Sequence, residues 1–185
     1  MWIVVDQALN RKQCVELSLS RNRGISVDGI SIIALALKTN KTLQIFSFTN
    51  SSKFSNESTE VLARGLRNNR YLRILDLSYN AIEDDGAEQL AQMLTVNQTL
   101  HELYLTKNRI RNQGAQQLAS VLEQSNTTLQ RLSLDYNPLA DGCVTSLIAM
   151  LKNNRTLKQL QILNTSALSA EAKARLSEIS KERVR

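Results

Sequence analysis

One pattern of eleven residues recurs along the chain and restricts its possible folds more than any other feature. It is clearest at residues 72–82, LRILDLSYNAI, where apolar residues fill the first, fourth, sixth and eleventh places and Asn80 fills the ninth. The first residues of its six copies lie 28 or 29 residues apart: Cys14, Leu43, Leu72, Leu100, Leu129 and Leu157. A fixed period of this length indicates one small structural unit that is stacked on copies of itself.

Each unit divides into a strand, a turn and a helix. Leu75 and Leu77 alternate with polar or outward residues, which predicts a short strand with one buried face. Asn80 falls where the chain leaves the strand, and its amide can satisfy backbone groups there. Ala87, Leu90, Ala91 and Leu94 follow at helical spacing within residues 83–94, and the acidic residues at 83–85 suit a helix start, where the helix dipole favours them.

Two further positions hold similar residues in nearly every repeat, and each such set of equivalent positions is here called a column. A small residue sits near each helix start, and we expect it to let the helix lie close against a strand: Gly29, Ser58, Gly86, Gly114, Cys143 and Ala172. An Asn precedes each following strand by a few residues, and we expect it to end the helix in a left-handed conformation: Asn40, Asn69, Asn97, Asn126 and Asn154. The polar second turn, at residues 49–58, predicts a looser loop.

A 28- to 29-residue period with a full helix in each unit resembles the ribonuclease-inhibitor-like class of leucine-rich repeats. That class also occurs in NOD-like receptor arrays, in the Ran GTPase-activating protein and in the C-terminal half of tropomodulins. The resemblance covers roughly residues 3–180. It implies an α/β solenoid, a short horseshoe arc of about six repeats, with parallel strands on the concave face and helices on the convex face.

The expected organisation has three parts. Residues 1–13 read as an N-terminal cap or half-repeat helix, residues 14–168 as the leucine-rich-repeat array, and residues 169–185 as a C-terminal capping helix. The last helix is charged outside its apolar stripe, so we expect the array to end there. No apolar run approaches the length that spans a membrane.

The cysteines and glycosylation triplets bear on location. Cys14 and Cys143 both fall at core positions, four repeats apart, so we expect free buried thiols and a reducing, cytoplasmic location. Seven Asn-x-Ser/Thr triplets would favour an extracellular protein. Four of them, however, consist of the helix-ending Asn and the Thr before the next Leu, so the repeat itself explains them.

The sequence offers little for catalysis. His101 is the only histidine, the glycines do not form a phosphate-binding loop, and no Cys/His cluster has metal-ligand spacing. Helix capping accounts for the acidic run at 83–85. We therefore predict a chain that is not an enzyme and that uses no cofactor or metal.

The net charge of +6 leaves two interpretations of the basic residues. Five of them precede or begin strands, so stacked repeats should place them along one edge, here called the basic rim: Lys41, Arg70, Arg73, Arg155 and Lys158. The rim could attract an acidic protein surface or phosphates, or it could simply be solvated. Aromatic residues do not interleave with it, which argues against nucleic acid as the partner.

Outward-facing strand residues form the surface that we expect to bind. In the three most regular repeats they combine tyrosines with charges, the composition of an interface hot spot: Asp76, Tyr79, Glu102, Tyr104, Lys107, Arg131, Asp135 and Tyr136. The alternative is that Tyr79 and Tyr136 cover the edge of the core. The corresponding positions of the first two repeats are mostly Ser and Thr.

These observations predict a non-catalytic protein-interaction module that uses its concave face. We expect a monomer whose partner is a protein that the sequence does not identify. The alternatives are a regulator of a small GTPase, an actin-binding module of the same repeat class, or a fragment of a larger protein of the NOD-like receptor type.

Overall fold

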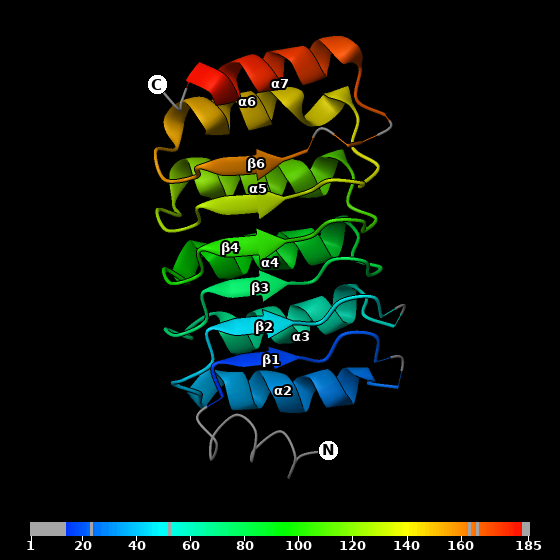
Figure 1. Cartoon of the computed structure of the whole chain (residues 1–185), viewed down its shortest axis with the longest axis vertical. Helices are drawn as coiled ribbons and strands as arrows, with labels where there is room; N and C mark the ends of the chain where they lie inside the picture. The colour runs from blue at the N-terminus through cyan, green and yellow to red at the C-terminus, as the bar shows by residue number, and fades with distance from the viewer. Residues whose placement is uncertain (1–13, 23, 52, 163, 166, 183–185) are drawn as a thin grey trace.

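The computed structural model describes residues 14–182 except 23, 52, 163 and 166, so the expected helix at 1–13 lies outside the described residues. Six parallel strands form one open sheet in chain order, and all point the same way in Figure 1. They are β1 Glu16–Ser18, β2 Ile45–Ser47, β3 Ile74–Asp76, β4 Glu102–Tyr104, β5 Arg131–Ser133 and β6 Gln159–Gln161. Each pairs with the next in the register that the repeat spacing predicts, such as Leu75 opposite Leu103.

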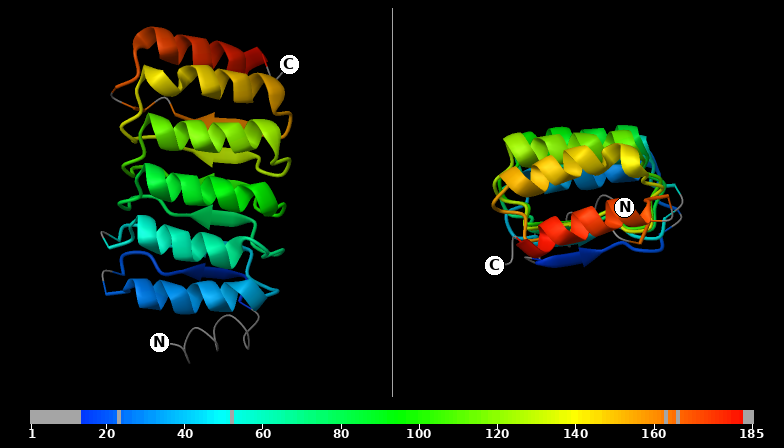
Figure 2. Two further views of the ribbon diagram at one scale, coloured as in Figure 1. Left: turned by 180° about the vertical axis from the view of Figure 1, so that it is seen from behind. Right: turned by 90° about the horizontal axis from the view of Figure 1, so that it is seen from above.

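A helical segment follows each strand and lies behind the sheet as a second layer (Figures 1 and 2). The segments are α2 Val27–Thr39, α3 Asn56–Leu66, α4 Asp84–Val96, α5 Asn112–Gln124, η2 Asp141–Cys143 leading into α6 Val144–Asn153, and α7 Ala170–Glu182. Packed helices lie about 8–10 Å apart but paired strands only about 4.8 Å apart, which places the strands on the inner, concave side. The predicted α/β solenoid is confirmed.

The core lies between the two layers. Leu75, Leu77 and Leu90 are fully buried, and the matching residues of the next two repeats are equally enclosed. Neighbouring repeats therefore bury one another's apolar surfaces, as a stacked array requires. In the end view of Figure 2, α7 lies closer to the strand layer than α5 and α6 do.

The turn asparagines satisfy backbone groups, as expected, and they also join neighbouring repeats. The Asn108 amide nitrogen donates to the carbonyl oxygens of Leu77 and Leu105, at 3.0 Å each, and its side-chain oxygen accepts from the Ile82 N–H at 3.1 Å. Asn80 and Asn137 make the equivalent bonds in their own repeats. Each turn is thereby fixed to the preceding repeat as well as to its own strand.

The prediction of left-handed helix-ending asparagines is wrong. Asn40, Asn97 and Asn154 are extended, with φ of −65°, −73° and −75°. An extended residue directs the chain towards the next strand and places its side chain inside the array. There the Asn126 amide nitrogen donates to Leu94 and Asn97 carbonyl oxygens at 2.9 and 3.0 Å. Its oxygen accepts from the Thr128 and Leu129 N–H groups at 3.1 and 2.9 Å.

The glycines near the starts of α4 and α5 lie close to the preceding helix: a Cβ on Gly86 would lie 2.8 Å from Asn56 Oδ1 in α3. A Cβ on Gly114 would lie 2.7 Å from Asp84 Oδ1 and 2.9 Å from Ala87 Cβ, both in α4. Asp84 needs this space because its Oδ1 accepts hydrogen bonds from the Arg111 and Gly114 N–H groups, at 2.7 and 2.9 Å. This acidic residue therefore caps the helix of the next repeat.

The same arrangement recurs along the array. The first residue of one helical segment accepts a backbone N–H at the start of the next: Asn56 from Glu83, Asn112 from Ala140, and Asp141 from Ser169. The accepting residue is Asn in some repeats and Asp in others, but in each of these contacts a side-chain oxygen accepts the hydrogen bond. Capping from the neighbouring repeat supplements the helix-dipole effect that the sequence suggested.

The second turn is held by a buried ring rather than being loose at its described residues. Phe54 is 1% exposed and its ring centroid lies 4.9 Å from that of Phe48. Ser51, which replaces the turn Asn, is buried and donates from Oγ to the Asn22 carbonyl oxygen at 3.0 Å. Phe54 fills the core position that Ile82 holds in the next repeat, although the residues around Phe54 are polar.

The expectation of two buried thiols is half right. Cys143 is fully buried, and burial raises its pKa to about 11. Cys14 is only half-buried, next to the first described strand. Both are free cysteines.

Candidate functional site

The eight candidate residues of the concave face lie on β3, β4 and β5 and in the turns that follow these strands. Parallel pairing places Asp76 beside Tyr104 and Glu102 beside Arg131. The side chains do not form one continuous group. They separate into two clusters and two carboxylates that bind the backbone.

The first cluster joins Glu102, Tyr104 and Arg131. The Tyr104 hydroxyl donates to Glu102 Oε2 at 2.5 Å, and Arg131 Nη1 lies 3.0 Å from Glu102 Oε1. Burial raises the pKa of Tyr104 above its usual value, and the hydrogen bond to Glu102 raises it further. The phenol therefore stays protonated at neutral pH and remains a donor. The three side chains fix one another's orientation on the face.

The second cluster follows the strands and contains Tyr79, Lys107 and Tyr136. All three have a left-handed backbone, with φ of 60°, 54° and 58°, which is unusual for residues other than glycine. The Lys107 ammonium lies 5.1 Å from the centroid of the Tyr79 ring, a cation–π distance. Tyr79 is 49% and Tyr136 59% exposed, so these rings face solvent instead of covering the core.

The left-handed conformation belongs to the repeat itself. Arg21 and Asn50 share it in the first two repeats. Each of these residues donates its backbone N–H to the next repeat; Lys107, for example, donates to the Asp135 carbonyl oxygen at 2.8 Å. The conformation costs roughly 1–2 kcal/mol per residue, and the ladder hydrogen bonds offset this cost. The fold thus holds Tyr79, Lys107 and Tyr136 in fixed, outward positions.

The remaining two candidates hold backbone in place. Asp76 Oδ1 accepts from the Ser78 N–H at 2.9 Å. Asp135 accepts from both the backbone and side-chain N–H groups of Asn164, at 3.2 and 3.3 Å. Their negative charges are therefore partly satisfied within the chain.

The five residues of the basic rim are exposed and lie at the opposite end of the strands from the tyrosine turns. A chain of backbone hydrogen bonds runs across the sheet from Arg73 to Lys158. His101 and Gln130 lie between these two residues in that chain. The structure therefore divides the rim into a group near β2 and β3 and a second group near β6.

A cavity of about 570 Å³ opens beside the second cluster. Its lining includes two predicted residues, Lys107 and Tyr136, together with Asn137, Pro138, Asn164, Thr165 and Lys173. Asn164 has the same position in the sixth repeat as Tyr136 in the fifth, but the sequence analysis did not select it. It missed Lys173 altogether, since that residue lies on α7 and carries no signal of the strand pattern.

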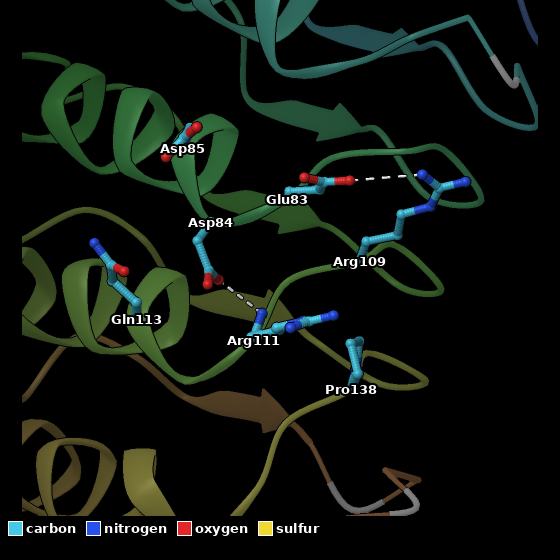
Figure 3. Close-up of a pocket in the computed structure, with 7 residues that line it drawn as sticks. All are labelled: Glu83, Asp84, Asp85, Arg109, Arg111, Gln113 and Pro138. Atoms are coloured by element: carbon cyan, nitrogen blue, oxygen red, sulfur yellow. Dashed lines mark hydrogen bonds and ion pairs between the residues drawn. The ribbon is translucent and has the colours of Figure 1, made fainter.

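A second hollow, of about 550 Å³, lies where strands lead into the helix starts (Figure 3). Three of its charged side chains have partners: Glu83 pairs with Arg109 at 3.5 Å, and Asp84 accepts from the Arg111 N–H. Both members of the ion pair are more than half exposed, and such pairs contribute little. The arrangement serves helix capping.

The described residues contain no group of three or more His, Cys, Asp and Glu side chains that could hold a metal ion. His101 is half-buried, and its Nδ1 donates to the Thr99 carbonyl oxygen at 2.6 Å. Among the described helices, none has the length and apolar character needed to cross a bilayer.

Comparison with known proteins identifies the repeat. Three stretches, 68–91, 96–119 and 125–147, match the sequence model of the leucine-rich repeat family. A search of curated protein sequences finds no match.

Two solved structures share the fold. The leiomodin-1 actin-binding site 2 is 18% identical, with 97% of this chain and 87% of that one covered and a TM-score of 0.66. The tropomodulin C-terminal domain of Caenorhabditis elegans is 17% identical, with 97% and 90% covered and a TM-score of 0.58. Three of the repeats match the leucine-rich repeat family, and the six strand-and-helix units give the chain the fold of a leucine-rich-repeat solenoid, as the resemblance to the ribonuclease-inhibitor-like class implied.

Proposed function

We propose that this chain is a non-catalytic protein-interaction module that binds its partner through the concave face of β3, β4 and β5. The observation that carries the proposal is the pair of clusters on this face, Glu102–Tyr104–Arg131 and Tyr79–Lys107–Tyr136. Tyrosine and arginine are enriched among residues that dominate binding energy. Here they project from a fixed backbone, which lowers the entropy lost on binding.

The exposure of Tyr79 and Tyr136 also supports binding through this surface. The two residues are 49% and 59% exposed, and covering that area gives a partner on the order of 1 kcal/mol for each residue. The fold does not require these rings, because Arg21 and Asn50 occupy the same column elsewhere. Their presence in two of the three central repeats, on either side of Lys107, therefore favours a binding role.

The test compares partner capture by the wild type and a double variant, Tyr79→Asn with Tyr104→Ser. Asn tolerates the left-handed backbone of position 79, and Ser stands opposite Tyr104 in the next strand, so both changes suit the repeat. The matched control is Tyr71→Asn, which removes an exposed ring outside the concave face. Capture is read by mass spectrometry, after circular dichroism has shown each variant folded.

We expect a partner that the wild type and the Tyr71→Asn control retain and the double variant loses. Equal capture by all three proteins would refute binding through this face. The same proteins in light scattering would test our proposal that the chain acts as a monomer.

Actin is a second candidate partner, favoured by the likeness to the structure named leiomodin-1 actin-binding site 2. At 18% identity that likeness shows a shared fold only. Cosedimentation with actin filaments and filament-end elongation assays would test the candidate directly. Absence of binding in both would remove actin without affecting the concave-face proposal.

We also propose a reducing, cytoplasmic location. Cys143 is free and fully buried, which suits a compartment that keeps thiols reduced. The four helix-ending asparagines in glycosylation triplets, Asn40, Asn97, Asn126 and Asn154, are at most 6% exposed and therefore poorly accessible for modification. Imaging of the tagged chain in its source cells tests this location.

A further inference from the structure

In the part of the chain that the structure describes, the lining of the cavity beside Tyr136 includes two lysines and no acidic residue. Lys107 reaches it from the turn after β4, and Lys173 reaches it from α7. Among the residues that the structure describes, neither lysine forms an ion pair with a carboxylate. Lys107 is instead next to the Tyr79 ring, which leaves its charge uncompensated.

The neighbouring carboxylates are already engaged. Glu102 holds Tyr104 and Arg131, while Asp135 accepts two hydrogen bonds from Asn164. Their capacity to pair with the lysines is thereby reduced. The two lysine charges in the described lining outnumber the one nearby carboxylate that is not ion-paired, Asp135, so the net charge there is positive and attracts an anionic group.

We propose that this cavity binds a glutamate or aspartate side chain from an acidic peptide segment of the partner. The proposal rests on the protein-binding function and names the chemistry of the ligand. Lys107 and Lys173 bind the carboxylate. Tyr136 and Pro138 supply an apolar wall for the side-chain methylenes.

Asn164 can orient the peptide. Its amide nitrogen donates to Asp135, so its side-chain oxygen remains available to accept a peptide N–H. The described lining contains no arginine, whose fork binds carboxylates and phosphoryl groups alike, so the two lysines act as point charges; the apolar wall of Tyr136 and Pro138 favours a side chain with methylenes. The cavity volume lies within the range of ligand sites.

The fold forms this cavity at one place. The left-handed turns fix Lys107 and Tyr136 in adjacent repeats. The last helix lies nearer the strand layer than α5 and α6 do, as Figure 2 shows, and this position lets α7 contribute to the cavity lining. The site thus depends on α7 as well as on the repeat.

The first experiment measures binding of a fluorescein-labelled decaglutamate peptide by anisotropy at about 0.15 M salt. The test variant combines Lys107→Gln with Lys173→Gln. The control combines Lys41→Gln with Lys158→Gln, which removes the same charge from the basic rim. We expect the test variant to bind about tenfold more weakly and the control less than about twofold more weakly. Equal weakening would show attraction by net charge alone and would overturn the proposal, as would failure of the wild type to bind.

Amide chemical shifts of the wild type locate the peptide. We expect the largest changes at Lys107, Asn164 and Lys173, whereas changes confined to the rim would overturn the proposal. A decapeptide with phosphoserine in place of the glutamates is the second probe. Binding about tenfold tighter than decaglutamate through the same lysines would refute the preference for a carboxylate.

The cavity and the proposed function can fail separately. If Tyr79→Asn with Tyr104→Ser loses the captured partner but the lysine variant retains it, the cavity proposal falls and the concave-face function stands. If decaglutamate binds through the lysines while the tyrosine variant captures every partner, the concave-face function falls alone.

Discussion

Replacing Asn126 with alanine tests the claim that helix-ending asparagines hold the repeats together. The side chain is 1% exposed and bridges two repeats. Its loss removes the partners of two carbonyl oxygens, those of Leu94 and Asn97, and of two N–H groups, those of Thr128 and Leu129. An unsatisfied buried polar group costs about 1–3 kcal/mol.

The lower end of that range applies because a water molecule can enter the space left by the amide. Four groups at about 1 kcal/mol each give an expected loss of about 4 kcal/mol in the free energy of unfolding. This is a large part of the 5–15 kcal/mol that is typical of a domain. The variant should therefore unfold at a much lower urea concentration.

Urea unfolding followed by circular dichroism measures the loss. Asn153→Ala is the matched control, because Asn153 is exposed and donates to Glu123 Oε1 on the surface. We expect the control to lose less than about 0.5 kcal/mol. A loss at Asn126 below about 1 kcal/mol, or one equal to that of the control, would refute the bridging role.

Three further predictions concern capping, thiols and pH. Asp84→Ala should lower the free energy of unfolding by about 1 kcal/mol, since α5 loses its cap, whereas the exposed Asp85→Ala should change it by less than about 0.5 kcal/mol, both measured in urea. Cys143, with its pKa raised to about 11 by burial, should react with a disulfide reagent at pH 8 only after unfolding, while the half-buried Cys14 reacts in the native protein. The pKa of Asp141 is lowered chiefly by the backbone N–H that it accepts before α7, so its contribution to stability is present above its unfolded pKa and is lost as pH falls through the folded value. The difference in urea midpoint between wild type and Asp141→Asn should therefore shrink as the pH is lowered from 7 to 2.

The sequence predicts the strand register because one repeat length fixes it. A spacing of 28 residues places Asp76 beside Tyr104, and the structure pairs them. It also predicts which strand residues are buried, since a strand with one enclosed face alternates with period two. Both features follow from the pattern within one repeat and from the length of that repeat.

The side-chain hydrogen bonds between repeats were not predicted, for a physical reason. Asn suits both a left-handed helix end and a buried bridge, and its partners decide between the two. Asn126 binds carbonyl oxygens of the preceding repeat, and Asp84 binds N–H groups of the following one. Nothing in the local pattern identifies such distant partners.

The candidate site was predictable only in part. Tyr79, Lys107 and Tyr136 fall in one column, so their placement on adjacent turns follows from the repeat. Their orientation, and the half-exposure of the rings, depend on a left-handed backbone that these residue types do not favour. Lys173 was not predictable, because its place in the cavity depends on how the last helix packs.

Comparison of the repeats separates residues that the fold needs from those that remain free for binding. Where a column keeps Asn, the side chain bridges repeats, as Asn108 and Asn126 do. The column of Tyr104 instead holds Ser, Asp and Gln in other strands, so the shared backbone makes no demand on it. Tyr79 and Lys107 likewise stand where other repeats place Arg or Asn. Packing does not account for these choices, and recognition of a partner is the explanation that the variants above test.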